Sequence, residues 1–404
     1  MNQTARIISI YAADTSGFCS ALFEYGGMSV IHDASGCNST YTTHDEPRWY
    51  DMDSMMYISG LTESDAVMGN DEKFVTDLVL AAEELKPEFV AICASALPAM
   101  VGIDMEAIAY EVESQTNIPS FEVKTNAMQS YITGAGNAFK ELAGRFTRDK
   151  TWSPASGDAD LKVNILGLTP LDFPLHGTCE AMGEWLKSNG LKVNAYVGMH
   201  PVNKDANDGE EGNKEKKDTH NLDEIVRLTD ANVNLVVSSI GKPLADYLYE
   251  KYGIPCVVGT PYGKAFSELL VEDLKKAAVQ GENIYSAKNR GAADSNIVVI
   301  GESITSASLA AALYHEKGKS PRVLESVGDG DMNVLNGPDD ISCTEEDELE
   351  KELSKAGIVI ADPLFEPICN GKKFIRLPHS AFSGRCFTRE EMNLINTSLD
   401  KLGV

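Results

Sequence analysis

The feature that most constrains the fold of this chain is an alternation of short, β-branched apolar runs with longer amphipathic stretches. The runs read MSVIHD, PEFVAICA, IPSFEV, LKVNILGL, LKVNAYVG, VNLVVSSI, IPCVVGT, NIVVIGES, PRVLESVG, GIVIADP and KKFIRLPH. Apolar runs of this length, separated by amphipathic segments, are typical of buried parallel strands joined by crossover helices. The pattern predicts an α/β protein built from doubly wound, Rossmann-like domains with parallel sheets.

Two polar stretches divide these runs into three groups. The first is RDKTWSPASGDAD, from Arg148 to Asp160, and the second is AKNRGAADSN, from Ala287 to Asn296. A chain of 404 residues is long for one core and suits two or three domains of ~100 to 200 residues each. We expect three α/β domains around a central cleft, at residues 1–155, 156–290 and 291–404.

The charge of the chain limits its partners. Asp and Glu total 61 against 35 Lys and Arg, giving a formal net charge of −26. Such an acidic surface repels phosphate backbones and anionic lipid, so neither nucleic acid nor a membrane is an expected partner. No apolar run approaches the ~18 to 20 residues of a spanning helix, and no signal peptide is evident, so a cytoplasmic location is expected.

The fingerprints of nucleotide binding are incomplete. Gly318-Lys319-Ser320 resembles the end of a P-loop, but Leu313 stands where the first glycine of that motif belongs. The partial glycine motifs GAGNAF and GDGDMN both lack the third glycine of a dinucleotide fingerprint. Any ATP or NAD used in the reaction is therefore expected to be handled by another protein.

The acidic run TEEDELEKEL, from Thr344 to Leu353, has the composition of a helix start. Thr344 with Asp347 three residues later fits a capping box, and acidic side chains suit the first turn of a helix. We expect a solvated helix here rather than a docking patch.

The cysteines of the first group of runs are the main candidates for chemistry. The chain has eight cysteines and no C-x-x-C, which excludes a zinc ribbon or thioredoxin-type motif. Cys19, Cys37 and Cys93 each follow or end a strand-like segment, and the carboxyl ends of parallel strands converge on one crevice. Thiolates suit iron-sulfur clusters. The alternative is that these cysteines are small buried apolar residues, and spacing alone favours that alternative.

Several ordered motifs carry a family resemblance. They are VIHDASGC (Val30 to Cys37), SGLTESDAVMGNDEKF (Ser59 to Phe74), FVAICASALPAMVGIDMEAI (Phe89 to Ile108), LYEKYGIPCVVGTPYG (Leu248 to Gly263) and PHSAFSGRCF (Pro378 to Phe387). Together they resemble the nitrogenase component 1 family, with a glycine turn ending in a cluster cysteine and a strand ending in another. The resemblance extends through all three groups of strands.

The resemblance implies a set of cluster residues. Cys19, Cys37 and Cys93 match the cluster-binding cysteines of the family, and His32 and Gly36 match the turn beside them, with Asp33 where the family usually has glycine. The implied cofactor is an iron-sulfur cluster, either 4Fe-4S or a larger cluster shared across a dimer interface. Three thiolates leave a cube one ligand short, so the fourth ligand is water, a carboxylate or a partner group.

The sequence departs from nitrogenase proper where that enzyme holds its iron-molybdenum cofactor. Ser238 and Ser239 stand where the family has the cofactor cysteine, and Cys386 and Phe387 stand where it has the histidine. Reduction of dinitrogen on that cofactor is therefore not expected. The implied substrate pocket consists of Ser238, Ser239, His379, Arg385 and Cys386.

The implied function is that of the catalytic component of a two-component reductase. Such a chain pairs as a homodimer, or as a heterodimer with a similar chain, and receives electrons from a separate ATP-hydrolysing iron-sulfur reductase. Its substrate is a tetrapyrrole or a small molecule. Two alternatives are a scaffold for metallocluster assembly and a non-catalytic ligand-binding protein, which would be colourless.

Overall fold

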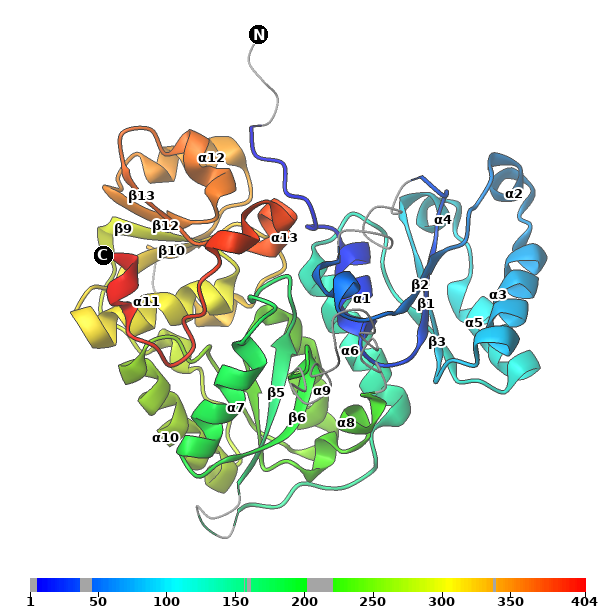
Figure 1. The fold of residues 1–404 in the computed structure, drawn as a ribbon, viewed down its shortest axis with the longest axis horizontal. Helices are drawn as coiled ribbons and strands as arrows, with labels where there is room; N and C mark the ends of the chain where they lie inside the picture. Colours follow the sequence, from blue (N-terminus) through cyan, green and yellow to red (C-terminus); the bar gives the residue numbers. More distant parts are fainter. Residues whose placement is uncertain (1–5, 37–45, 156, 158–160, 202–220, 337–338) are drawn as a thin grey trace, which may run out of the picture.

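The computed structural model describes residues 6–36, 46–155, 157, 161–201, 221–336 and 339–404. Within these residues the chain forms three sheets, of four, four and five strands, and all their strand pairs are parallel. Figure 1 shows the sheets as three lobes, with α1 (Asp14–Leu22) and α6 (Tyr131–Phe146) between the first lobe and the other two. The expected α/β fold with three parallel sheets is confirmed.

The first sheet has the strand order β2-β1-β3-β4. Its strands are β1 (Met28–His32), β2 (Met55–Ile58), β3 (Val90–Ala94) and β4 (Ser120–Val123). α3 (Asp71–Leu85) and α5 (Met105–Thr116) cover one face, whereas α1 and α6 cover the other. The shorter helices α2 (Glu63–Met68) and α4 (Ala96–Val101) follow β2 and β3.

The second sheet has the order β6-β5-β7-β8. Its strands are β5 (Lys162–Leu168), β6 (Lys192–Gly198), β7 (Val233–Val236) and β8 (Cys256–Val258). Its helices are α7 (Thr178–Ser188), α8 (Leu222–Val226), α9 (Lys242–Tyr252) and α10 (Lys264–Gln280). One buried cluster of side chains continues from α1 and α6 into β5, β7 and α9, so the first and second lobes share a core.

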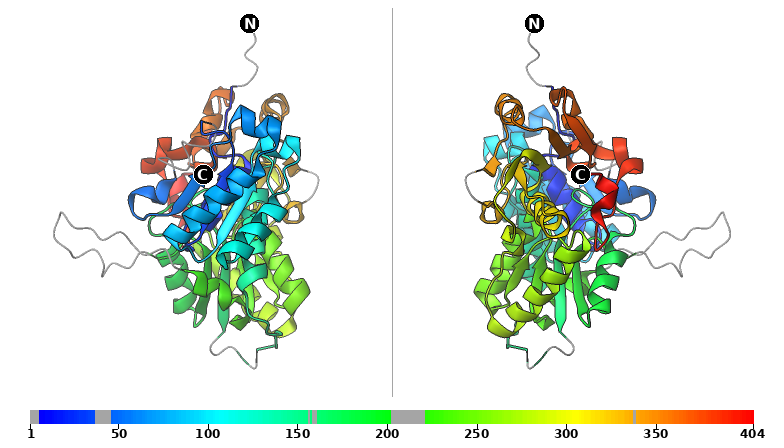
Figure 2. Two further views of the ribbon diagram at one scale, coloured as in Figure 1. Left: turned by 90° about the vertical axis from the view of Figure 1, so that its right-hand side faces the viewer. Right: turned by 90° about the vertical axis from the view of Figure 1, so that its left-hand side faces the viewer.

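The third sheet has the order β11-β10-β9-β12-β13. Its strands are β9 (Asp294–Gly301), β10 (Pro321–Glu325), β11 (Ile341–Ser342), β12 (Ile358–Ala361) and β13 (Lys373–Arg376). Its helices are α11 (Ser303–Lys317), α12 (Glu346–Leu353) and α13 (Ser380–Ser383). α11 packs against α10 of the second lobe, and the two views of Figure 2 show the third lobe above the second.

Cys19 does not lie beside a strand, contrary to the sequence-based expectation. It lies in α1, whose nine residues are all buried. The helix crosses α6 at very short range, because Gly17 and Gly134 leave room for the backbone of the other helix: a Cβ would stand 2.0 Å from the Tyr131 carbonyl oxygen and 1.9 Å from that of Asp14, respectively. The expected strand-end position of Cys19 is therefore wrong. A fully enclosed helix shows no amphipathic stripe, so the sequence pattern does not reveal α1 as a helix.

The acidic run forms α12, as expected, but not through the expected cap. The residue that precedes the helix is Glu345, and it makes no side-chain capping bond. Arg6 instead pairs with Glu346 and, at 2.7 Å, with Glu350, tying the N-terminal segment to the acidic face of the helix. The capping box at Thr344 is thus wrong, while the acidic first turn is confirmed.

The polar stretch after α6 packs on the second lobe. The backbone N–H of Trp152 donates to the Tyr252 carbonyl, its indole N–H donates to the Asn232 carbonyl, and the N–H of Ala155 donates to the Ala278 carbonyl.

Among the described residues, no helix combines the length and apolarity that crossing a membrane requires.

Candidate functional site

The strand order places a switch point in each sheet. Successive strands are added to opposite sides of the pairs β1/β3, β5/β7 and β9/β12, so that the connections leaving their carboxyl ends diverge. In doubly wound sheets, ligands bind in the crevice at such points. Polar or thiol side chains lie at or near all three: Cys93 on β3, Asp172 and Ser239 after β5 and β7, and Glu302 and Asp362 after β9 and β12.

At the switch point of the first sheet, the structure brings together two of the predicted cluster cysteines. Cys93 points toward the face covered by α1 and α6, on the same side as its β1 partner Ile31, and both Cys93 and Cys19 belong to the core cluster there. Both side chains are buried. Cys37 lies outside the described residues, although it directly follows Gly36.

The surroundings of the two thiols oppose their ionisation. Burial raises the pKa of Cys19, and burial together with the nearby charge of Cys19 raises that of Cys93, so free thiols here stay protonated. Cys19 and Cys93 belong to one buried cluster, and a cluster bound there would have to compensate the cost of ionising them. The described residues thus supply two candidate thiol ligands; within the described ranges, no group of three His, Cys, Asp or Glu side chains has metal-binding geometry.

The structure does not bring the His32 side chain beside these cysteines. Residues alternate between the two faces of a strand, and His32 pairs in register with Ala94, on the opposite face from Cys93. Its ring stacks on Phe74 at 4.0 Å between centroids, and its Nδ1 lies 2.8 Å from Ser59 Oγ. Burial lowers the pKa of His32 to about 4. Among the described residues, nothing lies within 4 Å of a Cβ built on Gly36, so none of them approaches closely enough to require a glycine there.

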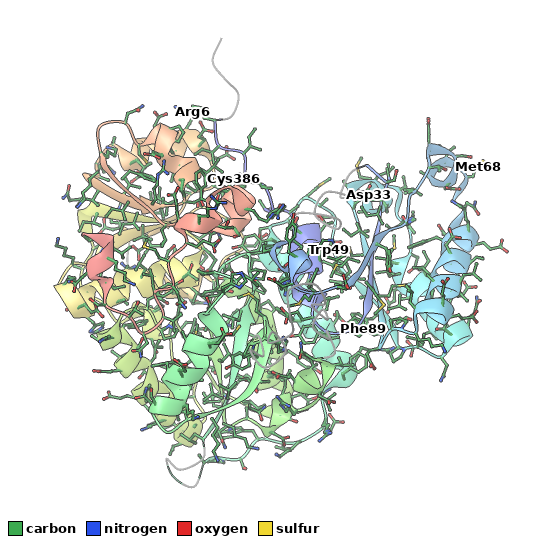
Figure 3. All side chains as sticks on the ribbon, viewed as in Figure 1. Arg6, Asp33, Trp49, Met68, Phe89 and Cys386 are labelled. Carbon is green, nitrogen blue, oxygen red and sulfur yellow. The ribbon has the colours of Figure 1, made fainter. Side chains whose placement is uncertain are left out.

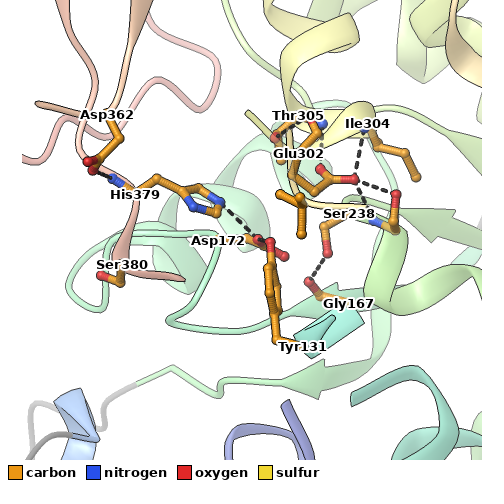
Figure 4. Close-up of polar contacts among 12 residues, drawn as sticks. Tyr131, Gly167, Asp172, Ser238, Glu302, Ile304, Thr305, Asp362, His379 and Ser380 are labelled. Carbon is orange, nitrogen blue, oxygen red and sulfur yellow. Dashed lines mark hydrogen bonds and ion pairs between the residues drawn. The ribbon is translucent and has the colours of Figure 1, made fainter. Parts of the chain in front are cut away.

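A second group of polar residues lies where the three lobes meet (Figure 4). Asp172 follows β5, and its Oδ1 accepts a hydrogen bond from Tyr131 Oη of α6, at 2.5 Å, and pairs with His379 Nε2, at 3.0 Å. The backbone N–H of His379 in turn donates to Asp362 Oδ2 at 2.8 Å. Each lobe therefore contributes one side chain to the cluster of Tyr131, Asp172 and His379, which we call the central triad.

The central triad has unused hydrogen-bonding capacity. Asp172 Oδ2 and His379 Nδ1 are buried and make no hydrogen bond among the described residues. Burial lowers the pKa of His379, but its hydrogen bond to Asp172 and the charges of nearby carboxylates outweigh this, so the pKa lies above its usual value. Burial and the charge of Asp172 raise the pKa of Tyr131 well above its usual value. The triad holds protons in the middle of the molecule.

Glu302 lies beside the central triad and is fully buried. It caps α11, because its carboxylate accepts the N–H groups of Ile304 and Thr305 at 2.9 and 2.8 Å. It also accepts the Ser239 hydroxyl and the Ser239 N–H. Burial, followed by the charge of Asp172, raises the pKa of Glu302. The other predicted serine, Ser238, donates to the Gly167 carbonyl at 2.8 Å.

Two cavities adjoin the central triad. The inner cavity has a volume of about 50 Å³ and is lined by Asp172, Glu302 and His379, together with apolar residues such as Tyr262, Leu309 and Leu394. The outer cavity, of about 250 Å³, is lined by neighbouring residues of the same segments, Pro170 to His176 and Ser380 to Glu391, and by Pro47. The segments that carry Asp172 and His379 thus contribute residues to both cavities.

The remaining predicted pocket residues lie toward the outside. Arg385 lines the outer cavity, with its guanidinium 5.0 Å from the centroid of the Tyr50 ring. Cys386 is exposed at the surface of the third lobe (Figure 3) and lines neither cavity among the described residues. His379 thus lines the inner cavity, and Ser239, which follows Ser238, bonds to Glu302 of the same cavity. Arg385 lines the outer cavity, and Cys386 lines neither of the two.

The sequence analysis did not predict four residues of this site: Tyr131, Asp172, Glu302 and Asp362. A signal for three of them was present, because Asp172, Glu302 and Asp362 are acidic residues that closely follow the buried runs NILGL, NIVVIG and GIVIA. Polar residues at such strand ends collect at the crevice. No comparable signal marks Tyr131, which begins a helix.

The fold and site define a class of protein with three doubly wound lobes, a buried thiol pair in the first and a proton-holding triad where the lobes meet. The chain belongs to the nitrogenase component 1 type oxidoreductase family, whose model matches residues 25–366.

Known proteins of this family share only part of the sequence. The chain is 26% identical over 149 residues to a nitrogenase molybdenum-iron protein beta chain of Acidithiobacillus ferridurans, covering 35% of this chain and 29% of that protein. It is 25% identical over 194 residues to a component of the light-independent protochlorophyllide reductase of Prosthecochloris aestuarii, covering 48% and 32%. It is 26% identical over 144 residues to the nitrogenase iron-molybdenum cofactor biosynthesis protein NifE of Sinorhizobium fredii, covering 35% and 27%. The chain thus aligns with about a third or less of the length of these relatives.

The similarity in fold is more extensive. Nitrogenase Cp1 at pH 6.5 superposes with a TM-score of 0.68 at 13% sequence identity, covering 100% of this chain and 93% of that chain. The same protein at pH 5 gives a TM-score of 0.58 at 15% identity, covering 100% and 90%.

Proposed function

We propose that this chain is the catalytic component of a two-component nitrogenase-like reductase that reduces a small molecule held at the central triad. The observation that carries the proposal is the placement of two buried thiols, Cys19 and Cys93, at the switch point of the first sheet in a chain of this family. Cys37 is proposed as a third ligand. An iron-sulfur cluster on these thiolates supplies single electrons.

The residues of the chain itself supply protons. Each electron added to a buried substrate builds up charge unless a proton follows, because burying uncompensated charge is costly. The raised pKa of His379 keeps its imidazolium available, and Asp172 orients that ring through Oδ1. Tyr131 donates to the same oxygen and so helps to hold the carboxylate in the position that orients His379.

The size of the inner cavity favours a small substrate over a tetrapyrrole. Its volume of about 50 Å³ lies far below the roughly 300 to 1,000 Å³ of ordinary ligand pockets. A macrocycle requires the lobes to separate, whereas a molecule of a few heavy atoms fits beside His379 without such a movement. A tetrapyrrole remains the alternative substrate, and its binding to the purified chain would show as a shifted absorption band.

The proposal includes a partner that covers the first lobe near the cluster, either a second copy or a similar chain. α4 begins directly after β3 and exposes Leu97, Met100 and Val101 by 43, 75 and 50% of their surfaces. An exposed apolar strip of this kind is a common feature of protein interfaces. Sedimentation of the purified chain tests this partner, and Met100→Glu should weaken the association.

The experiment that tests the function is anaerobic purification of the chain, followed by reduction with an ATP-dependent iron-sulfur reductase from the same source. We expect a brown protein with bound iron and sulfide, an electron paramagnetic resonance signal that changes on addition of reductase and ATP, and no ATP hydrolysis by the chain alone. A colourless chain without iron would contradict the proposal and favour a plain ligand-binding protein.

A second candidate function is that of a scaffold for metallocluster assembly. Its support is the similarity to NifE, a cofactor biosynthesis protein. The two candidates differ in the fate of the metal centre. A scaffold releases it to an acceptor protein, whereas a reductase keeps it through repeated cycles of reduction.

A further inference from the structure

The outer cavity is basic in a strongly acidic chain. Two arginines and a histidine, Arg385, Arg389 and His176, line a space of about 250 Å³. The chain as a whole carries 61 acidic side chains against 35 Lys and Arg. Such a local excess of positive charge attracts anions, and the low-dielectric walls of a cavity strengthen the attraction.

The arginines reach the cavity from one short segment that the fold holds in place. Arg385 and Arg389 lie in the 3-10 helix Gly384–Glu390, directly after α13, and Gly384 adopts a positive φ of 57° at the junction. The guanidinium of Arg385 stacks on Tyr50 in the 3-10 helix Pro47–Tyr50 of the first lobe. Arg389 is exposed and makes no ion pair or hydrogen bond within the described part of the chain, so its donors are available to a ligand.

Among the described residues, one acidic side chain also lines the cavity, against two arginines. Glu391 accepts a hydrogen bond from Ser380 Oγ at 3.1 Å. Burial raises its pKa, although the charges of His379 and His176 act in the opposite direction. The two guanidinium groups outnumber this carboxyl group in the described lining.

The position of the outer cavity relates it to the central triad. Ser380 follows His379 in the chain, and the segment Pro170 to His176 also carries Asp172, so a molecule seated in the outer cavity lies next to the triad. Guanidinium groups bind carboxylates in a bidentate geometry that fixes orientation as well as affinity.

We propose that the outer cavity binds the carboxylate groups of the substrate, which is therefore a small organic acid with its reducible group directed toward His379. This inference rests on the proposed function in assigning the bound acid to the substrate. The volume suits an acid of a few carbon atoms, and the two arginines suit a dicarboxylate.

Isothermal titration calorimetry of the full chain with linear dicarboxylates, from succinate to adipate, tests this assignment. We expect saturable binding of at least one acid, weakened tenfold or more by Arg389→Gln and by Arg385→Gln. The matched control is Arg145→Gln, an exposed arginine of α6 that pairs with Glu113 far from the cavity. It should leave the binding unchanged, and all three variants should keep the iron content of the unsubstituted chain.

The outcomes separate this inference from the proposed function. Absence of saturable binding, an equal loss in Arg145→Gln, or equally tight binding of inorganic phosphate at the same arginines overturns the dicarboxylate site. A chain that binds the acid but holds no iron retains the site and loses the reductase function. A chain that holds iron but binds no acid loses the dicarboxylate site and retains the reductase function.

Discussion

The Nε2 atom of His379 lies 3.0 Å from Oδ1 of Asp172, and this contact joins the segment after β13 in the third lobe to the segment after β5 in the second. Because Tyr131 of the first lobe donates to the same oxygen, one carboxylate oxygen links all three lobes. The state of protonation of this contact therefore bears on both the structure and the proposed reaction.

Replacing Asp172 should change the titration of His379. The hydrogen bond and charge of Asp172 are the main influences that raise the pKa of His379 against burial. We expect that histidine to titrate above its ordinary pKa of about 6.5 in the unsubstituted chain, and at a clearly lower pH in Asp172→Asn. Nuclear magnetic resonance of labelled histidines measures this, with His379→Gln identifying the signal and Asp400→Asn as a remote control. An unchanged midpoint in Asp172→Asn would contradict the contact.

The crossing of α1 and α6 should be intolerant of a single methyl group. In Gly134→Ala the new Cβ meets the backbone of Asp14 at 1.9 Å, so the helices must move apart. We expect a loss of about 1 to 3 kcal/mol in the free energy of unfolding, or more. Gly144→Ala, on the same helix, meets only Tyr247 Oη at 4.0 Å and should stabilise by up to about 1 kcal/mol. Equal denaturation midpoints for the two variants would show that the close crossing is absent.

The sequence predicts most of the strands because they are buried. Every predicted apolar run overlaps a strand of the structure, whereas β2 and β11 were missed. β2 lies at an edge with three of its four residues partly or fully exposed, and β11 has only two residues. β11 is too short to produce an apolar run, whereas β2 reads MMYI, a run of four apolar residues that the sequence analysis did not single out.

The site was predictable only in part, for a related reason. The cysteines and His379 are unusual residue types in recognisable motifs, so the family resemblance identified them. Asp172 and Tyr131 acquire their importance from the meeting of lobes, which depends on how α1 and α6 pack, and a single sequence does not encode that arrangement in any local pattern. The direction of the His32 side chain likewise depends on its register with Ala94.

Removing Arg48 should destabilise the chain strongly. Its buried guanidinium pairs with Glu46 at 2.6 Å and with Glu24 at 3.1 Å. Arg48→Met removes the guanidinium from two buried carboxylates, of which Glu24 keeps its contact with His200, and the expected cost is about 3 kcal/mol of unfolding free energy. Arg145→Met, which removes an exposed ion pair, should cost at most about 1 kcal/mol. Chemical denaturation measures both, and similar losses would contradict the buried network.

The acid stability of the chain should depend on His32. Burial depresses its pKa to about 4, so the folded state resists protonation that the unfolded chain accepts near 6.5. The stability conferred by the neutral ring is fully present above pH 6.5 and is lost as the pH falls toward 4, by up to about 3 kcal/mol. His32→Gln should therefore lose less stability than the unsubstituted chain over this window. Parallel curves of unfolding free energy against pH would contradict the depressed pKa.

Iron and sulfide content of anaerobically prepared variants tests the central claim most directly. Cys19→Ala and Cys93→Ala each remove one buried thiol of the proposed cluster site, whereas Cys256→Ala removes an equally buried thiol from β8 in the second lobe. We expect the first two variants to lose most of their iron and brown colour, because a cluster left with fewer thiolates is poorly anchored. Cys256→Ala should keep both, with thermal unfolding confirming that all three fold. Equal iron in Cys93→Ala and the unsubstituted chain would contradict the account and return these cysteines to the apolar core.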